Sequence, residues 1–174
     1  MLQTYSIELR ALEPSDIDIL YNWENDQKLW HLSNTVAPFS KFILEQYIMN
    51  AEQDIFTAKQ LRLMIDKSEK KIKSTIGAID LFDFDPVNHR AGVGILIKKS
   101  EQKKGYATQA LKILIEYSFN VLQLHQIYCN ITTDNLPSLE LFKKQNFEII
   151  GIKKEWLFIK DQWVDEYILQ LIKR

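Results

Sequence analysis

Short apolar runs separated by polar turns fill the middle of the chain and predict strands. Apolar residues dominate positions 61–65, 74–84 and 90–98, and charged or turn-forming residues gather at 66–71 and 83–88. This pattern is typical of strands that are joined by hairpins. Together with an apolar stretch at 5–9, it predicts an antiparallel sheet in the first half of the chain.

Four other segments carry apolar residues at helical spacing. The first begins with Pro14 and Asp16, which suit the first turn of a helix, and extends to about residue 25. The second spans 41–52, the third about 104–121 and the fourth about 134–145. The third has one continuous apolar face, which must pack on the sheet. This face consists of Ala107, Ala110, Leu111, Leu114, Ser118, Val121 and Leu122.

Further apolar runs at 126–132, 147–150, 154–159 and 163–171 predict additional strands. A helix connects strand 90–98 to strand 126–132, so these two strands should run parallel through a right-handed crossover. The sequence therefore predicts an α/β (α+β) fold with a mixed, mostly antiparallel sheet, one parallel strand pair and about four helices. With 174 residues, we expect a single domain over 1–174. Its ligand should bind at the carboxyl ends of the parallel strands.

Composition narrows the classes of partner. Hydrophobic residues make up 46% and charged residues 26%, as in soluble globular proteins. The net charge of −1 gives no global basic field, so we expect neither nucleic acid nor a membrane as partner. No apolar run approaches the ~20 residues of a membrane helix, and we expect a cytoplasmic protein. Cys129 is the one cysteine, and the histidines show no metal-ligand spacing, so no metal is expected.

A polar loop with one glycine lies between strand 90–98 and the long amphipathic helix. The first turn of a helix leaves backbone N–H groups without partners at its positive end, which favours a bound phosphate. A glycine allows a ligand to approach the backbone, and two lysines add positive charge. The alternative is a tight strand-to-helix connection without a ligand. The loop consists of Gln102, Lys103, Lys104, Gly105, Tyr106, Ala107 and Thr108.

The chain resembles the GNAT superfamily of N-acetyltransferases. The signature of that superfamily, Q/R-x-x-G-x-G/A, lies between the fourth strand and the third helix, and residues 102–107 match every specified position. Residues 88–91, 104–110 and 135–138 are most similar to the bacterial branch of spermidine and ribosomal-protein N-terminal acetyltransferases. The resemblance covers nearly the whole chain and implies the acyl-CoA N-acyltransferase fold.

The resemblance implies acetyl-CoA as the cosubstrate. Backbone N–H groups of the loop from Gln102 to Thr108 would hold its diphosphate, and Asn135 would also contact it. The fourth strand would pair with the pantetheine arm through its backbone. Two glycines, Gly92 and Gly94, would permit a bulge that separates this strand from strand 126–132. The pantetheine-binding positions would be Ile95, Leu96 and Ile97.

The resemblance also implies direct attack of a primary amine on the thioester. An alkylamine has a pKa near ~10.4, so a base must remove a proton. Two usual acid/base groups are absent, because Phe142 stands in place of the family's tyrosine and Gly92 in place of a glutamate found in polyamine-acetylating relatives. Ser138 matches the serine that the ribosomal-protein branch uses near the thiol. Alternatively, Ser138 is only a polar residue in the first turn of its helix.

The base and the acceptor remain open at this level. Glu24, His31 and Asp80 are the candidates for the base, and Glu24 and His31 are the candidates for substrate contacts. Trp30 and His31 are candidates to line a pocket, or else Trp30 seals the edge of the core and His31 lies on the surface. The acceptor is a polyamine, an amino sugar nucleotide or a protein α-amine.

Two other classes of protein compete with an N-acetyltransferase. A CoA-binding sensor or assembly module with little catalysis fits the absence of the tyrosine. A generic nucleotide-binding domain fits poorly, because the loop has neither three glycines nor Gly-Lys-Ser/Thr. Homo-oligomers are frequent in the resembled family, so a dimer or another homo-oligomer is a possible state of this chain.

Overall fold

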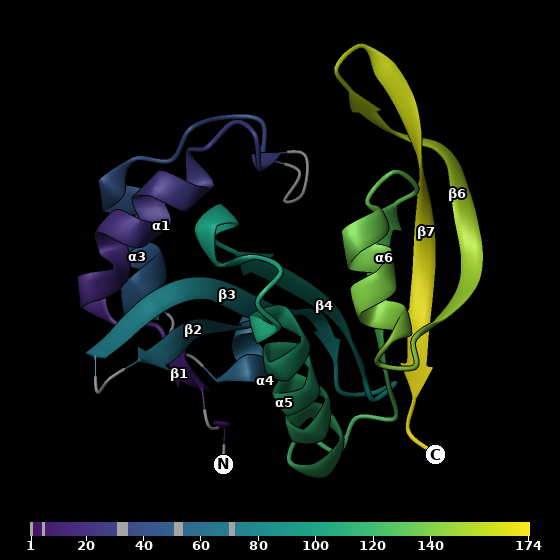
Figure 1. Cartoon of the computed structure of the whole chain (residues 1–174), viewed down its shortest axis with the longest axis horizontal. Helices are drawn as coiled ribbons and strands as arrows, with labels where there is room; N and C mark the ends of the chain where they lie inside the picture. Colours follow the sequence, from purple (N-terminus) through teal and green to yellow (C-terminus); the bar gives the residue numbers. More distant parts are fainter. Residues whose placement is uncertain (1, 5, 31–34, 51–53, 70–71) are drawn as a thin grey trace.

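Seven strands form one mixed sheet in the order β1-β2-β3-β4-β5-β7-β6 (Figure 1). The computed structural model describes residues 2–4, 6–30, 35–50, 54–69 and 72–174. Neighbouring strands are antiparallel except β4 and β5, which are parallel as predicted. The strands are β1 (Ile7–Ala11), β2 (Leu61–Glu69), β3 (Ile72–Asp85), β4 (Arg90–Ile97), β5 (Gln126–Thr132), β6 (Glu148–Ile159) and β7 (Gln162–Ile172).

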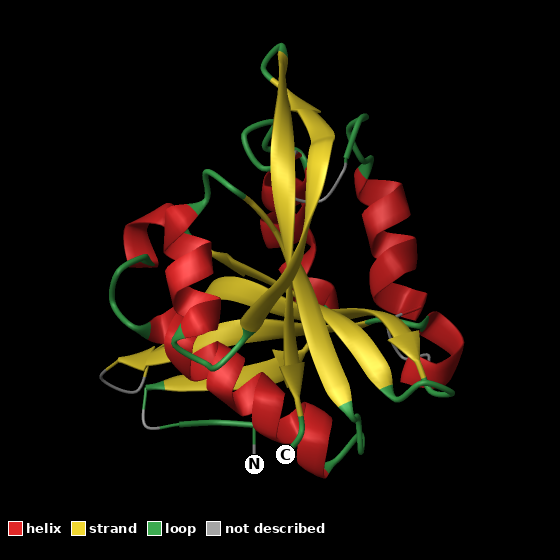
Figure 2. Ribbon diagram, turned by 90° about the vertical axis from the view of Figure 1, so that its right-hand side faces the viewer, coloured by secondary structure: helices red, strands yellow, loops and turns green. Residues whose placement is uncertain are grey.

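Helices lie on both sides of this twisted sheet (Figure 2). On one side, Ala110, Leu111 and Leu114 of α5 belong to the main core together with strand residues such as Ile79 and Ile127. A second, smaller cluster joins α1 to α3. The described helices are α1 (Ile17–Glu24), α3 (Lys41–Asn50), α4 (Ile55–Ala58), α5 (Tyr106–Asn120) and α6 (Leu136–Lys143), with 3-10 turns η1 (Pro14–Asp16) and η2 (Lys99–Glu101).

The structure differs from the predicted elements in three places. The charged segment 66–71 was expected to be a turn, but β2 extends through it to Glu69, because Asp66 is buried and paired with Arg10. The runs 147–150 and 154–159 belong to one strand, β6, which keeps its pairing with β7 through two register shifts. The four-residue helix α4 was not predicted, since it is too short to show a period.

Strands β4 and β5 pair over a short distance and then separate. Their parallel register ends at Gly92 and Tyr128, so the rest of β4, from Val93 to Ile97, pairs with β3 alone among the described strands. The predicted separation of these two strands is therefore confirmed. It leaves one backbone edge of β4 facing the gap between the two halves of the sheet.

The predicted bulge is not in β4. Its register with β3 is regular from Ile97 to Gly92, and the shift lies in β3 between Phe82 and Asp85. Gly92 is needed instead because the Phe82 ring covers it: an added Cβ would lie 2.3 Å from that ring. The backbones of β3 and β4 also approach closely at Gly77, since a Cβ there would lie 2.2 Å from the Leu96 carbonyl oxygen.

A buried ionic network fastens β1 to the rest of the first half. Arg10 donates hydrogen bonds to Asp16 (2.7 and 2.8 Å) and to Asp66 (2.8 Å), and the side chains of both aspartates are less than a tenth exposed. Burial acts to raise the pKa of Asp16, but hydrogen bonds from Arg10 and the Glu13 amide outweigh it and hold the pKa below its usual range. The network therefore ties η1, β1 and β2 together.

Replacing Arg10 by Met should lower the free energy of unfolding at pH 7 by about 3 kcal/mol, because two buried carboxylates lose their cation. Asp16 has a depressed pKa in the folded state, so its contribution is present above the unfolded pKa of ~3.9 and is lost as the pH falls through the folded value. Urea unfolding at several pH values measures both effects. The matched control is Lys41→Ala at the exposed Lys41–Asp18 pair, which should cost less than about 1 kcal/mol. Equal costs for the two variants would contradict the role of the network.

Candidate active site

The glycine of the polar loop forms the N-cap of α5 in a left-handed conformation. Gly105 has φ 83°, and α5 begins at Tyr106. A Cβ added to Gly105 would have no neighbour within 4 Å among the described residues, so the space above the helix end is open. The loop thus presents the positive end of a 15-residue helix to that space. This geometry fits the diphosphate of acetyl-CoA at residues 102–108.

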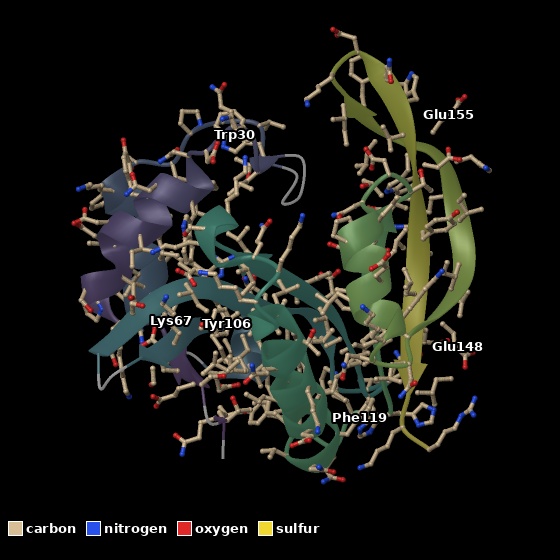
Figure 3. All side chains as sticks on the ribbon, in the orientation of Figure 1. Trp30, Lys67, Tyr106, Phe119, Glu148 and Glu155 are labelled. Carbon is tan, nitrogen blue, oxygen red and sulfur yellow. The ribbon has the colours of Figure 1, made fainter. Side chains whose placement is uncertain are left out.

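The two lysines of the loop are not equivalent. Lys104 Nζ lies 3.0 Å from Glu101 Oε2, while Lys67 of β2, labelled in Figure 3, lies 3.0 Å from Glu101 Oε1. Hydrogen bonds from Lys67 and then Lys104 hold the pKa of Glu101 below its usual range, so it is ionised at neutral pH. Lys103 is exposed, with φ 62°. The charge of Lys104 is therefore partly balanced by Glu101, which the sequence pattern did not reveal.

The loop is also attached to the segment of β4 from Val93 to Ile97, which no longer pairs with β5 and is hereafter called the free part of β4. Gln102 Nε2 donates to the Ile97 carbonyl oxygen at 3.0 Å, which links the signature glutamine to the end of the strand. The predicted pantetheine positions, Ile95, Leu96 and Ile97, lie in the segment of β4 that has left β5. A linear ligand that leaves the α5 N-terminus can therefore pair with this strand edge. The loop and strand fit acetyl-CoA together.

Helix α6 begins on the other side of the gap. Asn135 caps it by accepting a hydrogen bond from the Ser138 amide at 3.3 Å. Ser138 is half-buried in the first turn. Phe142, one turn later, is buried in the core and packs edge-to-face on Phe147 with ring centroids 5.0 Å apart. The position of the family's tyrosine thus serves packing here, while Asn135 and Ser138 occupy the helix end near the gap.

A cavity of about 130 Å³ lies beside the free part of β4. It is lined by the end of α1 and by strands β2, β3 and β4. Arg62 binds Asp80 through Nε (2.8 Å) and Nη2 (3.2 Å), and binds Glu24 through Nη1 (2.6 Å). Two carboxylates against one guanidinium give these three side chains a net charge of −1. The lining residues are Trp23, Glu24, Leu29, Arg62, Ala78, Asp80, Gly94, Ile95 and Leu96.

The register of the sheet explains why these groups meet. Arg62 pairs with Asp80 across β2 and β3, and Asp80 pairs with Gly94 across β3 and β4, so all three positions face one side. A Cβ at Gly94 would lie 4.0 Å from Asp80 Oδ2. Asp80 thus lies directly beside the backbone of β4, and the absence of a side chain at Gly94 leaves room there.

Two aromatic residues contact members of this charged cluster. The Arg62 guanidinium carbon lies 5.6 Å from the centroid of the Tyr47 ring, and burial raises the pKa of Tyr47. Trp30, labelled in Figure 3, donates its indole N–H to the backbone oxygen of Glu24 at 2.9 Å. It therefore anchors the segment that follows α1. Its neighbour His31, a candidate for the base and for substrate contacts, lies outside the described residues.

Of the predicted site residues, the structure brings two groups together. The loop 102–108 and β4 residues 95–97 adjoin one another, and Glu24 and Asp80 share one cavity next to that strand. Arg62 was missed, because its isolated place in an apolar strand gives no sign of its partners until the register is known. Among the described residues, no group of acidic, histidine or cysteine side chains could hold a metal ion, and none of the described helices could cross a membrane.

The chain belongs to the acetyltransferase (GNAT) domain family, whose model matches residues 6–148. The predicted fold and family are thereby confirmed, and the chain is an N-acetyltransferase by family. Enzymes of this family use acetyl-CoA, which the geometry of the loop and of β4 fits.

The alignments with similar proteins cover nearly the full length of this chain. Spermidine N(1)-acetyltransferase of Vibrio cholerae is 26% identical over 170 residues, which span 94% of this chain and 93% of that protein. An uncharacterized N-acetyltransferase p20 of Bacillus licheniformis is 25% identical over 176 residues, which span 99% of this chain and 96% of that one. The crystal structure of the Vibrio cholerae spermidine N-acetyltransferase with CoA and spermine has a TM-score of 0.86 at 24% identity, covering 97% of this chain and 96% of the other. This last similarity shows a shared fold.

Replacing Gly105 by Glu should abolish CoA binding while the protein stays folded. The new side chain would bring a negative charge into the open space above α5, and the left-handed backbone would cost about 1 kcal/mol. Calorimetry with CoA measures the loss, and circular dichroism checks the fold. The matched control is Gly151→Ala, where an added Cβ also has no described neighbour within 4 Å and the backbone φ is not positive. Unchanged affinity in Gly105→Glu would contradict the assignment of the loop.

Proposed function

We propose that this protein transfers the acetyl group of acetyl-CoA to a primary amine that binds in the cavity around Arg62. The observation that carries this proposal is the position of Asp80, whose carboxylate lies beside Gly94 on the free part of β4. A nucleophile held by Asp80 would be next to the strand that pairs with the pantetheine arm. The Vibrio cholerae relative, which binds CoA and spermine, supports an amine as acceptor.

The charges of the cavity suit an ammonium group. Burial acts against the charge of Arg62, but Asp80 and Glu24 outweigh it, so the pKa of Arg62 is raised and it stays cationic. The remaining unit of negative charge attracts the protonated amine. Since the attacking amine must be neutral, a proton has to leave it, and Asp80 is the proposed acceptor of that proton. Arg62 fixes the orientation of the Asp80 carboxylate with two hydrogen bonds.

Acetyl-CoA supplies an activated acyl group and a thiol leaving group. Its diphosphate is assigned to residues 102–108 and its arm to Ile95, Leu96 and Ile97, with Asn135 as a further contact. Ser138 is the proposed hydrogen-bond donor to the sulfur, since Phe142 has no proton to give and is buried in the core. We assign Glu24 to the binding of the acceptor rather than to proton transfer, because Asp80 is the carboxylate that pairs with Gly94 across the sheet.

We propose that residues 1–174 act as one domain in the cytoplasm and that the protein forms a homo-oligomer. A dodecameric structure of the Vibrio cholerae relative supports an oligomer. The second candidate function is a CoA-binding sensor with little catalysis, which the use of Phe142 for packing favours.

A panel of amines, assayed by release of free thiol from acetyl-CoA, separates an enzyme from a sensor. We expect turnover with at least one linear amine. The variant Asp80→Asn, which keeps an oxygen for Arg62, should lower kcat/KM about 100-fold. The loss should shrink as the pH approaches the pKa of the amine, because the acceptor then needs no base. CoA affinity should not change.

The panel also has a result that contradicts the proposal. If no amine is acetylated while CoA binds, the sensor is the better description. If Asp80→Asn retains full activity at neutral pH, the protein is an enzyme whose base lies elsewhere. The matched control is Asp18→Asn, an exposed carboxylate at the start of α1 that lies outside the cavity lining.

A further inference from the structure

A second groove lies on the sheet next to the point where β4 and β5 separate. Its volume is about 680 Å³, and it runs from the β3–β4 turn across β5 to β7 and β6. Tyr128, the last residue of β5 that pairs with β4, lines it. The other lining residues are Asp83, Asp85, Arg90, Gln126, Ile150, Ile168 and Gln170.

This groove and the cavity around Arg62 open on the same side of the sheet. Asp80 and Phe82 are two residues apart on β3, so their side chains point to one face. The Phe82 ring contacts Tyr128 edge-to-face with centroids 6.0 Å apart. Phe82 therefore lies between the carboxylate proposed to bind the reacting amine and the second groove.

The bulge in β3 turns Asp83 toward the groove. In a regular strand Asp83 would point to the face opposite Phe82. Instead it has φ 49° within the register shift, and the Tyr128 hydroxyl donates to Asp83 Oδ2 at 3.2 Å. Bulges often redirect a side chain next to an active site. Burial first, and then Asp83, raises the pKa of Tyr128 to about 12, so its hydroxyl remains a donor at neutral pH.

The two aspartates of the groove have different surroundings. Asp85 accepts hydrogen bonds from the amides of Val87 and Asn88 and from the Asn88 side chain, and it pairs with Arg90 at 3.2 Å. Asp83 is exposed and accepts a hydrogen bond from the Tyr128 hydroxyl. With Arg90 balanced by Asp85, the charged side chains of the groove sum to −1. The remaining negative charge, at Asp83, therefore suits a cation.

We propose that Asp83 and Tyr128 form a subsite for a second cationic nitrogen of the acceptor, so that the protein selects linear amines by the spacing of their nitrogens. This inference rests on the proposed function, since it takes Asp80 as the position of the reacting nitrogen. Asp83 follows Asp80 by three positions along β3, which corresponds to roughly 10 Å. An extended chain of about seven methylene groups spans that distance. Its methylenes would lie along Phe82 and Tyr128.

The test compares α,ω-diaminoalkanes, from the propane to the decane chain, with n-alkylamines of the same lengths. For the unaltered protein, kcat/KM should reach its maximum near the heptane and octane diamines, and these should exceed the matching alkylamines. In Asp83→Asn, kcat/KM for the best diamines should fall about tenfold, while the alkylamines should keep their values. The matched control is Asp161→Asn at the exposed tip of the β6–β7 turn, where φ is 61°. Asparagine tolerates the left-handed backbone at both positions.

The outcomes separate this inference from the proposed function. Acetylation of diamines and alkylamines with no preference for length would overturn the subsite and leave the transferase intact. A maximum that persists in Asp83→Asn would also overturn it, because the preference would then arise elsewhere. If no amine reacts, the proposed function fails and the subsite fails with it. A loss in Asp83→Asn that is equal for diamines and alkylamines would show a general structural effect and contradict the subsite.

Discussion

The separation of β4 from β5 after Gly92 and Tyr128 is the constraint on which the rest of this structure depends. Backbone N–H and C=O groups of a strand need partners, and a strand that leaves its neighbour offers those groups to a ligand. The separated segment ends at the loop that begins α5, so a helix N-terminus and a strand edge are joined through Gln102. The helix N-terminus can bind an anion, and the strand edge can bind an extended polar chain. Acetyl-CoA contains both parts.

The acceptor side follows from the same geometry. Asp80 pairs with Gly94 just beyond the separation, which places a carboxylate beside the strand edge that is proposed to receive the cosubstrate. Arg62 orders this carboxylate together with Glu24 and leaves one negative charge in excess. On the other side of Phe82, the bulge brings Asp83 to the same face. Two carboxylates, Asp80 and Asp83, therefore lie along β3 on either side of Phe82. The positions of both depend on how β3 pairs with its neighbours.

Much of the fold could be predicted from the sequence, because local patterns determine it. The alternating strands, the apolar face of α5 and the glycine before that helix are all short-range signals, and the crossover rule then fixes the parallel pair. The features that could not be predicted depend on long-range register. The continuation of β2 past Asp66 requires Arg10, which lies 56 residues away. The role of Arg62 and the bulge at Asp83 appear only when β2, β3 and β4 are aligned.

Backbone amide hydrogen exchange, measured with and without CoA, tests the central claim most directly. The account predicts that CoA slows exchange in two segments above all others: the free part of β4, residues 93–97, and the loop 102–108. In Gly105→Glu, CoA should slow neither segment. Slower exchange in the loop without any change in β4 would contradict the claim that the separated strand receives the cosubstrate, and so would protection confined to β6 and β7.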